Sequence, residues 1–377
     1  MSLAELETPC LLLDETKLEH NITRMHEHLA TFNVPLRPHV KTPKCLEVVR
    51  KSLASQPGGI TVSTLKEADV FVQHGITDIL YAVSMVPSKL PHVAKLQAVG
   101  ATITVVVDSV PAAEQLASGC AERDLTLPVL IEIDSDGHRA GIQPDDHEAL
   151  LAVAHALDAS PQLHLKGVMT HAGESYHCAS PSAITTFARK EQDAVRHAAT
   201  VLREAGLTCE VVSVGSTPTA QLGEGFDGIT EVRAGVFVFY DLVMAGLGVC
   251  QVNDVALSVL TTVIGHQAHK NWILTDGGWL SLSRDRGTSK QTVDYGYGLV
   301  CDIDGKPLED LIVSDASQEH GIITNRSGQN IDINQFPIGT RLRILPNHAC
   351  ATAAAHPAYQ VLQEGQVKDT WKRFGFW

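Results

Sequence analysis

The chain alternates short apolar segments with amphipathic ones from residue 34 to about residue 240. Nearly continuous runs of Val, Ile and Leu are typical of parallel strands buried on both faces, and helical spacing fills most gaps between them. The predicted strands are LRPHVK, GITVS, ILYAVS, TITVVVDS, LPVLIEID, LKGVMTH, CEVVSVGS and ITEVRAGVFV. Eight such units predict an α/β fold with a closed (β/α)8 TIM-type barrel. A doubly wound open sheet is the alternative, but no GxGxxG follows the first strand.

The pattern changes on both sides of this region. A helix is predicted over residues 15–32, after a short strand in TPCLLLD. Beyond residue 250, apolar runs are separated by Gly, Asp and Asn turns and no long helix is expected, which indicates a mainly antiparallel β domain. We therefore predict a barrel over residues 15–248, and a β domain formed by residues 1–14 and 249–377 that recruits the early strand.

Composition narrows the classes of partner. The net charge of −14 argues against nucleic acid or an anionic membrane as partner. No stretch approaches the roughly 20 apolar residues of a membrane span, and the N-terminus lacks the layout of a signal peptide. Eight cysteines without CxxC spacing fit reduced thiols. We expect a cytoplasmic protein with a small-molecule substrate.

The segment VPLRPHVKTPK, residues 34–44, is unusually basic for this acidic chain. Strand periodicity would place Arg37, His39 and Lys41 on one face. They could form a solvated rim on an exposed edge, or they could line a polar pocket.

The remaining strand ends favour the pocket, because the C-terminal ends of barrel strands form the active site. The residues at those ends are Lys41, Ser63, Ser84, Asp108, Asp134, His171, Ser216 and Arg233, followed by His138 and Arg139 in DSDGHRAG. The loops after strands seven and eight commonly bind phosphate. Here they contain Gly215, Ser216 and Thr217, and then Gly235 with Tyr240 beyond it.

A phosphate site opposite a lysine suggests pyridoxal 5′-phosphate, which forms a Schiff base with a lysine side chain. Lys41 is the best candidate because it is expected to end the first strand on the inward face. Arg37 and His39 on that face would favour its neutral amine. This reading makes the basic face the lining of a cofactor pocket.

Together, RPHVKT, DGHRAG, THAG, VSVGSTPT and EVRAG resemble the fold-type III pyridoxal phosphate enzymes, whose barrel is that of the alanine racemase N-terminal domain. With LPNHACAT, the chain is more narrowly similar to the D-serine dehydratase-like group, which includes D-threonine aldolases and D-threo-3-hydroxyaspartate dehydratases. The likeness to the hydroxyaspartate enzymes is strongest in ITVSTLKEA, TDILYAVSM, SRDRGT and QEHGI.

The resemblance implies roles for individual residues. Lys41 would be the Schiff-base lysine and the base that removes the α-proton. Arg139 would hydrogen-bond the cofactor ring, His171 would lie along it, and Tyr176 would contact ring or substrate. The phosphate would be held by Gly215, Ser216, Thr217 and Gly235, with Tyr240 as a possible helper. A satisfied core histidine is the alternative for His171. A homodimer is also implied.

The PNHAC segment suggests a metal site. His348 and Cys350 are two apart on an expected strand, so both would point the same way. Imidazole with thiolate suits zinc, and two protein ligands leave positions for water and substrate. In the group it resembles, this is the metal site of the dehydratases, whereas the aldolases have a carboxylate in place of the cysteine.

These observations lead to a metal-assisted, pyridoxal phosphate-dependent dehydratase that converts a D-3-hydroxy amino acid to a 2-oxo acid and ammonia. D-serine, D-threonine and 3-hydroxyaspartate all remain candidate substrates. Retro-aldol cleavage to glycine and an aldehyde is the close alternative. A pyridoxal phosphate-binding homeostasis protein without turnover is a third, although such proteins resemble the barrel alone.

Overall fold

The computed structural model describes residues 2–53 and 58–375, which divide into two compact units. One unit comprises Arg24–Gly235, and the other comprises the residues up to Thr23 together with Val236–Gly375. The predicted division at residues 15 and 248 differs from this one at both ends, and residues 1, 376 and 377 of the predicted β domain lie outside the described residues. The first border falls within α1 (Glu15–Ala30).

The barrel unit contains an eight-stranded parallel sheet within its described residues, in the order β2-β9-β8-β7-β6-β5-β4-β3. A single bridge between His39 and Thr61 joins the two ends, so the barrel is nearly closed. This confirms the predicted fold. The strands are β2 (Leu36–Pro38), β3 (Ile60–Val62), β4 (Asp78–Ser84), β5 (Thr102–Val107), β6 (Leu127–Ile133), β7 (Leu163–Thr170), β8 (Val211–Val214) and β9 (Glu231–Ala234).

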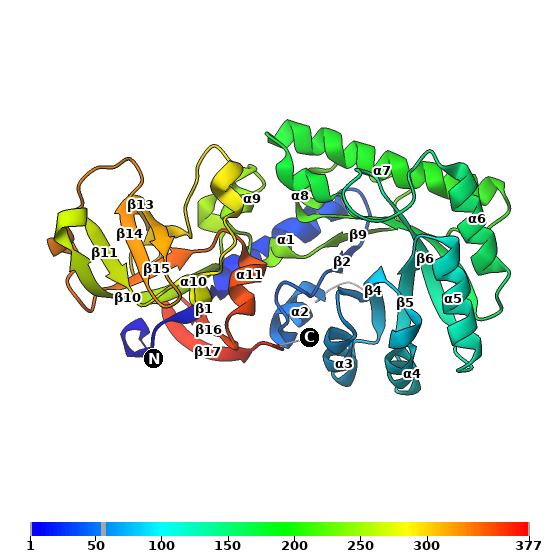
Figure 1. Ribbon diagram of the computed structural model, residues 1–377, viewed down its shortest axis with the longest axis horizontal. Helices are drawn as coiled ribbons and strands as arrows, with labels where there is room; N and C mark the ends of the chain where they lie inside the picture. Colours follow the sequence, from blue (N-terminus) through cyan, green and yellow to red (C-terminus); the bar gives the residue numbers. More distant parts are fainter. Residues whose placement is uncertain (1, 54–57, 376–377) are drawn as a thin grey trace. The chain divides into compact units, whose positions relative to one another are not determined.

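Helices cover the outer face of these strands (Figure 1). They are α2 (Leu46–Leu53), α3 (Leu65–Gln73), α4 (Leu90–Ala98), α5 (Val110–Ala121), α6 (His147–Asp158), α7 (Pro181–Glu204) and the short α8 (Thr217–Leu222). Polar caps start several of them: Ser180 accepts a hydrogen bond from the Ala183 amide at the start of α7. Between α6 and α7, η3 (Gly173–His177) follows β7. None of the helices in the described parts of the chain is long and apolar enough to cross a bilayer.

The second unit is built on a nine-stranded sheet, counted over its described residues, in the order β11-β14-β13-β12-β15-β10-β1-β16-β17. An extra pairing of β10 with β11 closes six of the strands into a barrel, and every pairing except β1 with β16 is antiparallel. The strands are β1 (Cys10–Asp14), β10 (Leu257–Gln267), β11 (Trp272–Thr275), β12 (Leu299–Cys301), β13 (Pro307–Ala316), β14 (Gly321–Asn325), β15 (Arg341–Leu345), β16 (Ala358–Gln363) and β17 (Gln366–Lys372). The β domain and its recruitment of the early strand are therefore confirmed.

Short helices connect the strands of this unit: α9 (Leu242–Gly246), α10 (Trp279–Leu282), α11 (Ala349–Ala354) and the 3₁₀ turns η4 (Val236–Val238) and η7 (Gly287–Lys290) among them. Its core is apolar and lies between the strands. One cluster comprises Leu242, Val255, Leu299, Cys301, Ile312 and Leu345. Helix α11 follows β15 and begins at the predicted metal residues.

Candidate active site

Lys41 lies in an exposed turn just beyond β2, not on the strand itself. The strand ends at Pro38, and only the bridge at His39 continues it. Lys44, three residues further on, is different because its ammonium group pairs with Glu67 at 3.2 Å. Lys41 is therefore accessible in the turn that follows β2, as expected for the cofactor lysine. Lys44 instead forms an ion pair with Glu67.

Arg37 is not part of that site, which corrects one expectation from the sequence. Its guanidinium group bonds Glu231 at 2.7 Å and Asp78 at 3.1 Å through two nitrogens. These carboxylates belong to the first residues of β9 and β4, at the opposite end of the strands from Lys41. Arg37 therefore closes the N-terminal end of the barrel with its charge neutralised, and it does not act on Lys41.

His39 and His171 lie beside Lys41 and share its positive field. Desolvation lowers the pKa of His39 well below its ordinary value, and the charges of Lys41, Arg233 and Arg139 lower it further. Desolvation and the charge of Lys41 likewise lower the pKa of His171 to about 3. Both rings are therefore neutral near pH 7. The Nδ1–H of His171 donates to the Gly215 carbonyl at 2.8 Å, which fixes the ring's tautomer and orientation.

Arg233 is the third residue of β9 and points to its neighbours within the sheet rather than to solvent. It is buried, donates to Ser213 Oγ at 2.6 Å and also bonds the Thr170 carbonyl. Burial raises the pKa of the neighbouring Glu132, and Arg139 and Arg233 oppose that rise. Arg139 itself is exposed beyond β6. Its charge acts on His39, His171 and Glu132, so the structure brings it to the same end of the barrel as Lys41.

The loop after β8 forms a group of linked hydroxyls. Ser216 Oγ lies 2.8 Å from Ser175 Oγ and 3.0 Å from Thr219 Oγ1. Thr217 is fully buried, and its Oγ1 has no hydrogen-bond partner within the described structure. A buried hydroxyl without a partner is costly unless a ligand satisfies it. A phosphate oxygen at this position would do so, and this fits the predicted phosphate site.

The two glycines of the predicted phosphate site allow close packing of the backbone. Gly215 has a φ of +146°, and a Cβ there would lie 1.9 Å from the Arg233 carbonyl oxygen. A Cβ on Gly235 would lie 3.0 Å from the carbonyl oxygen of His39, in the segment that leads to Lys41. The Gly215 amide already donates to Glu191 at 2.8 Å. Gly215 therefore shapes the loop, and its amide is not available for a phosphate.

Glu191 is a buried acid that the sequence analysis did not single out. It lies on α7 and is 1% exposed. Burial raises its pKa to about 7, against the lowering effect of hydrogen bonds from the Thr219 hydroxyl and the amides of Gly215 and Ala172. A sequence signal existed: Ile184, Ala188, Glu191 and Val195 follow the buried stripe of α7 at helical spacing, so an acid occupies a core position.

Of the two predicted tyrosines, Tyr176 lies half-buried in η3, just after β7. Tyr240 follows η4 in the β-rich unit, with a wholly buried ring and a φ of +47°. Their contacts with a cofactor stay predictions.

His348 and Cys350 are not on a strand, which corrects the geometric basis of the metal prediction. Strand β15 ends at Leu345, His348 is the N-cap of α11, and Cys350 lies in the first turn of that helix. The two side chains are nevertheless hydrogen-bonded to each other. The described residues contain no group of three or more His, Cys, Asp or Glu that could hold a metal ion. The pair alone therefore forms the candidate metal site, with two protein ligands.

Asp285 of the SRDRGT segment orients His348. Its Oδ2 lies 2.6 Å from His348 Nδ1. Desolvation lowers the pKa of His348, but the hydrogen bonds to Asp285 and Cys350 outweigh this effect and raise that pKa to about 11. Because Nδ1 faces a carboxylate, Nε2 is the nitrogen left for a metal, an arrangement common around metal-bound histidines. The sequence motif contained this residue, but nothing in it indicated the contact.

Asp241 fixes the start of the helix that carries these candidate ligands. This buried carboxylate accepts hydrogen bonds from the amides of Ala349 at 2.9 Å and Met244 at 3.0 Å, so it caps α11 and α9 together. The donor set, imidazole plus thiol with oriented supports, fits a borderline-soft divalent ion.

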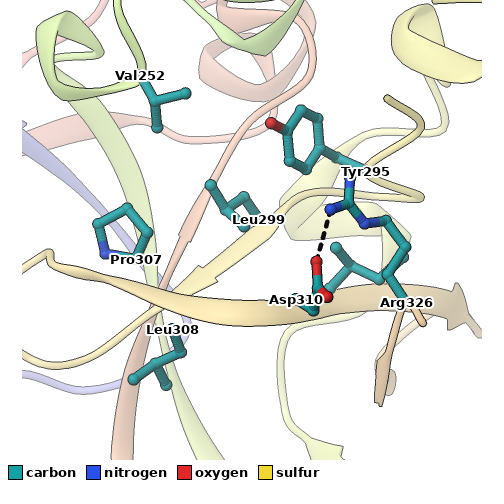
Figure 2. Close-up of a pocket in the computed structure, with 8 residues that line it drawn as sticks. Val252, Tyr295, Leu299, Pro307, Leu308, Asp310 and Arg326 are labelled. Atoms are coloured by element: carbon teal, nitrogen blue, oxygen red, sulfur yellow. Dashed lines mark hydrogen bonds and ion pairs between the residues drawn. The ribbon is translucent and has the colours of Figure 1, made fainter. Parts of the chain in front are cut away.

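A pocket of about 240 Å³ lies elsewhere in the β-rich unit (Figure 2). It is lined by Val252, Tyr295, Leu299, Pro307, Leu308, Asp310, Ile312 and Arg326. The figure shows Arg326 paired with Asp310, so the pocket's cation is neutralised. None of the predicted site residues lines this pocket, so we assign it no role in the candidate active site.

Comparison with known families gives two matches that together span most of the chain. The family described as "Alanine racemase, N-terminal domain" matches residues 13–242. The family described as "Putative serine dehydratase domain" matches residues 256–362.

Full-length relatives agree with both matches. The chain is 50% identical to D-threo-3-hydroxyaspartate dehydratase of Delftia sp. (strain HT23), covering 100% of this chain and 99% of that one. It is 29% identical to D-serine dehydratase of Dictyostelium discoideum, covering 99% and 98% of the two chains.

Solved structures extend the likeness to three dimensions. A metal-free cysteine-to-alanine mutant of a D-threo-3-hydroxyaspartate dehydratase has a TM-score of 0.98 at 49% identity, covering 100% of both chains. A histidine-to-alanine mutant of an enzyme of that name, substituted two positions earlier, also has a TM-score of 0.98 at 49% identity, covering 100% of this chain and 97% of that one. D-threonine aldolase from Filomicrobium marinum has a TM-score of 0.82 at 26% identity, covering 98% and 96%.

Proposed function

Since this chain belongs to the D-serine dehydratase-like family of enzymes built on the alanine racemase N-terminal domain, we propose that it is a pyridoxal phosphate- and metal-dependent dehydratase. Its substrate is a D-3-hydroxy amino acid and its products are a 2-oxo acid and ammonia. The observation that carries this proposal is the His348–Cys350 pair, since imidazole and thiolate together provide a site for a Lewis-acid metal. We infer zinc as the metal from the softness of that pair.

Different residues of the barrel unit bind different parts of the cofactor. Lys41, in its exposed turn, is the covalent attachment point and the base that removes the α-proton. Neutral His171, fixed by the Gly215 carbonyl, would lie against the cofactor ring, and Arg139 would hydrogen-bond that ring. Ser216 and the unpartnered Thr217 hydroxyl would hold the phosphate. When bound, pyridoxal phosphate supplies the electron sink and the metal supplies Lewis-acid polarisation of a hydroxyl.

The β-rich unit supplies the metal ligands. His348 Nε2 and Cys350 Sγ are the donors, and Asp285 holds the His348 ring through Nδ1. The net reaction removes the β-hydroxyl and the α-proton as water, and hydrolysis then releases ammonia and the 2-oxo acid. Among candidate substrates we favour D-threo-3-hydroxyaspartate, because the relative that is 50% identical over the whole chain bears that name. All eight cysteines are free, which supports the inference of a reducing cytoplasm, and we infer a homodimer from the family likeness.

The test is a product assay with D-threo-3-hydroxyaspartate, D-serine and D-threonine. We expect ammonia and 2-oxo acid in equal amounts, with turnover dependent on added pyridoxal phosphate. Equal amounts of glycine and an aldehyde would instead identify retro-aldol cleavage, which D-threonine aldolase performs on a similar fold. Absence of both product pairs with all three substrates would overturn the proposal.

A further inference from the structure

Glu191 is a buried acid near the cofactor residues that the proposed function leaves without a role. It lies on α7, which contacts α8 and η3, the segments that follow β8 and β7. Its carboxylate accepts hydrogen bonds from three places: the Gly215 amide after β8, the Ala172 amide after β7 and the Thr219 hydroxyl in α8. One side chain on α7 therefore joins the loop after β7 to the loop after β8.

The contact with Thr219 connects Glu191 to the proposed phosphate residues. The Thr219 hydroxyl, which is hydrogen-bonded to Glu191, also accepts from the Ser216 amide at 3.2 Å and lies 3.4 Å from the Ser216 carbonyl oxygen. Thr219 Oγ1 also lies 3.0 Å from Ser216 Oγ. Ser216 immediately precedes Thr217, whose buried hydroxyl is unpartnered in the described structure. The carboxylate is thus hydrogen-bonded to residues on both sides of the Ser216–Thr217 pair.

We propose that Glu191 is a positioning residue for the cofactor phosphate, holding the Ser216–Thr217 loop in its binding conformation through Gly215, Ala172 and Thr219. This inference rests on the proposed function, since it takes the loop to be the phosphate site. A structural carboxylate would be expected to act on stability alone. A positioning carboxylate acts on the affinity for one part of the ligand, and that difference can be measured.

The substitution Glu191→Gln separates these roles. Glutamine has nearly the same shape, and its oxygen can still accept from the Gly215 amide. Its NH₂ group, however, cannot accept a hydrogen bond, so glutamine cannot serve the Gly215 amide, the Ala172 amide and the Thr219 hydroxyl as the carboxylate does. We expect the loop to shift and the affinity for pyridoxal phosphate to fall by at least about tenfold, since leaving a buried donor unpaired costs about that much.

The experiment compares two ligands on the full-length protein after removal of the cofactor. Dissociation constants for pyridoxal phosphate and for pyridoxal, which lacks the phosphate, are measured by absorbance titration. The contact of Gly215 with His171 affects the ring, which both ligands share. The ratio of the two constants therefore reports the phosphate site alone. We expect Glu191→Gln to lower this preference for the phosphorylated ligand at least about tenfold.

Two further variants serve as matched comparisons. Gln192 is the adjacent residue, equally buried at 1%, but it bonds the Glu224 carbonyl at 3.2 Å rather than the loop. Gln192→Ala should leave the ratio unchanged even if it lowers thermal stability. Thr219→Val removes the hydroxyl that links Glu191 to Ser216 and should lower the ratio as Glu191→Gln does. It provides the test if Glu191→Gln does not fold.

The outcomes distinguish this inference from the function on which it rests. If Ser216→Ala with Thr217→Ala lowers the ratio but both Glu191→Gln and Thr219→Val leave it at the wild-type value, the role of Glu191 is overturned and the phosphate site stands. If the wild-type protein does not prefer the phosphorylated ligand, the phosphate site itself is wrong and this inference falls with it. A loss of preference in Glu191→Gln and not in Gln192→Ala supports the inference.

Discussion

At the residue scale, Lys41 and Lys44 differ in what surrounds them, although they share one turn. Lys44 is paired with Glu67, whereas Lys41 is exposed at the end of the barrel where His39 and His171 are held neutral. We expect Lys41→Ala to lose the cofactor's visible absorbance and to lower turnover by at least about 100-fold, the usual contribution of a general base. Lys44→Ala should keep both. Borohydride reduction followed by peptide mass mapping should mark Lys41, and a mark on Lys44 or Lys66 would show that the assignment is wrong.

Asp285 should control metal affinity although it is not a ligand. Removing the carboxylate that orients a metal-bound histidine typically costs 10–100-fold in affinity. We expect Asp285→Ala to show a loss of about that size, and Asp285→Asn a smaller one, because its oxygen still accepts from Nδ1–H. Elemental analysis after dialysis against buffered zinc measures the effect.

Asp294→Asn is the control for Asp285, since it removes a carboxylate that pairs with Arg286 at 2.9 Å rather than with His348. Equal metal content in Asp285→Ala and the wild type would contradict the positioning of His348 by Asp285.

At the scale of elements, the close approach of β8 to β9 depends on Gly215. A methyl group there would lie 1.9 Å from the Arg233 carbonyl oxygen, so Gly215→Ala must push the strand ends apart where the phosphate residues begin. We expect a loss of stability of several kcal/mol, as for other severe steric changes. Gly206→Ala is the control. Gly206 also has a positive φ, +78°, but a Cβ added there would have no atom of the described residues within 4 Å.

The Gly206 variant should therefore lower the free energy of unfolding by only about 1 kcal/mol, because a residue with a Cβ disfavours this backbone conformation. Thermal unfolding of both variants and the wild type measures the difference. Equal shifts would mean that backbone strain, not the approach of the two strands, constrains Gly215.

At the scale of the whole molecule, the residues proposed to bind the cofactor and those proposed to bind the metal belong to different units. Lys41, His171 and Thr217 are in the barrel unit, whereas His348 and Cys350 are in the β-rich unit. We therefore expect a chelator to abolish most dehydratase activity while the cofactor absorbance and the circular dichroism stay unchanged. His348→Ala should behave like the chelated protein, because a single thiolate holds a metal weakly.

Cys350→Asp should retain some metal, with a harder ligand set that favours manganese or magnesium, and its products should move towards aldol cleavage. Metal content and product ratio are measured together for the wild type and both variants. Full activity in protein shown to contain no metal would overturn the metal's role.

The sequence by itself determined the parts of this protein that local patterns encode. Eight apolar runs with helical spacing between them specify eight buried parallel strands, because a strand covered on both faces has no polar face. Polar residues at strand ends identified the open end of the barrel, where Lys41, His171 and Ser216 lie. The final third of the chain has short apolar runs separated by turn residues, and this local pattern specified the β domain.

Only the tertiary structure decided which charges meet. The spacing of Arg37 and Lys41 places both on one face of an expected strand. Arg37, however, is neutralised by Glu231, 194 positions away, and is not part of the site. Asp285 reaches His348 across 63 positions, and Glu191 reaches Gly215 across 24. Such contacts depend on how elements pack, which hydrophobic periodicity does not record. The start of α11 at His348 is likewise set by the distant cap from Asp241, so a local pattern of alternating residues could not reveal the helix.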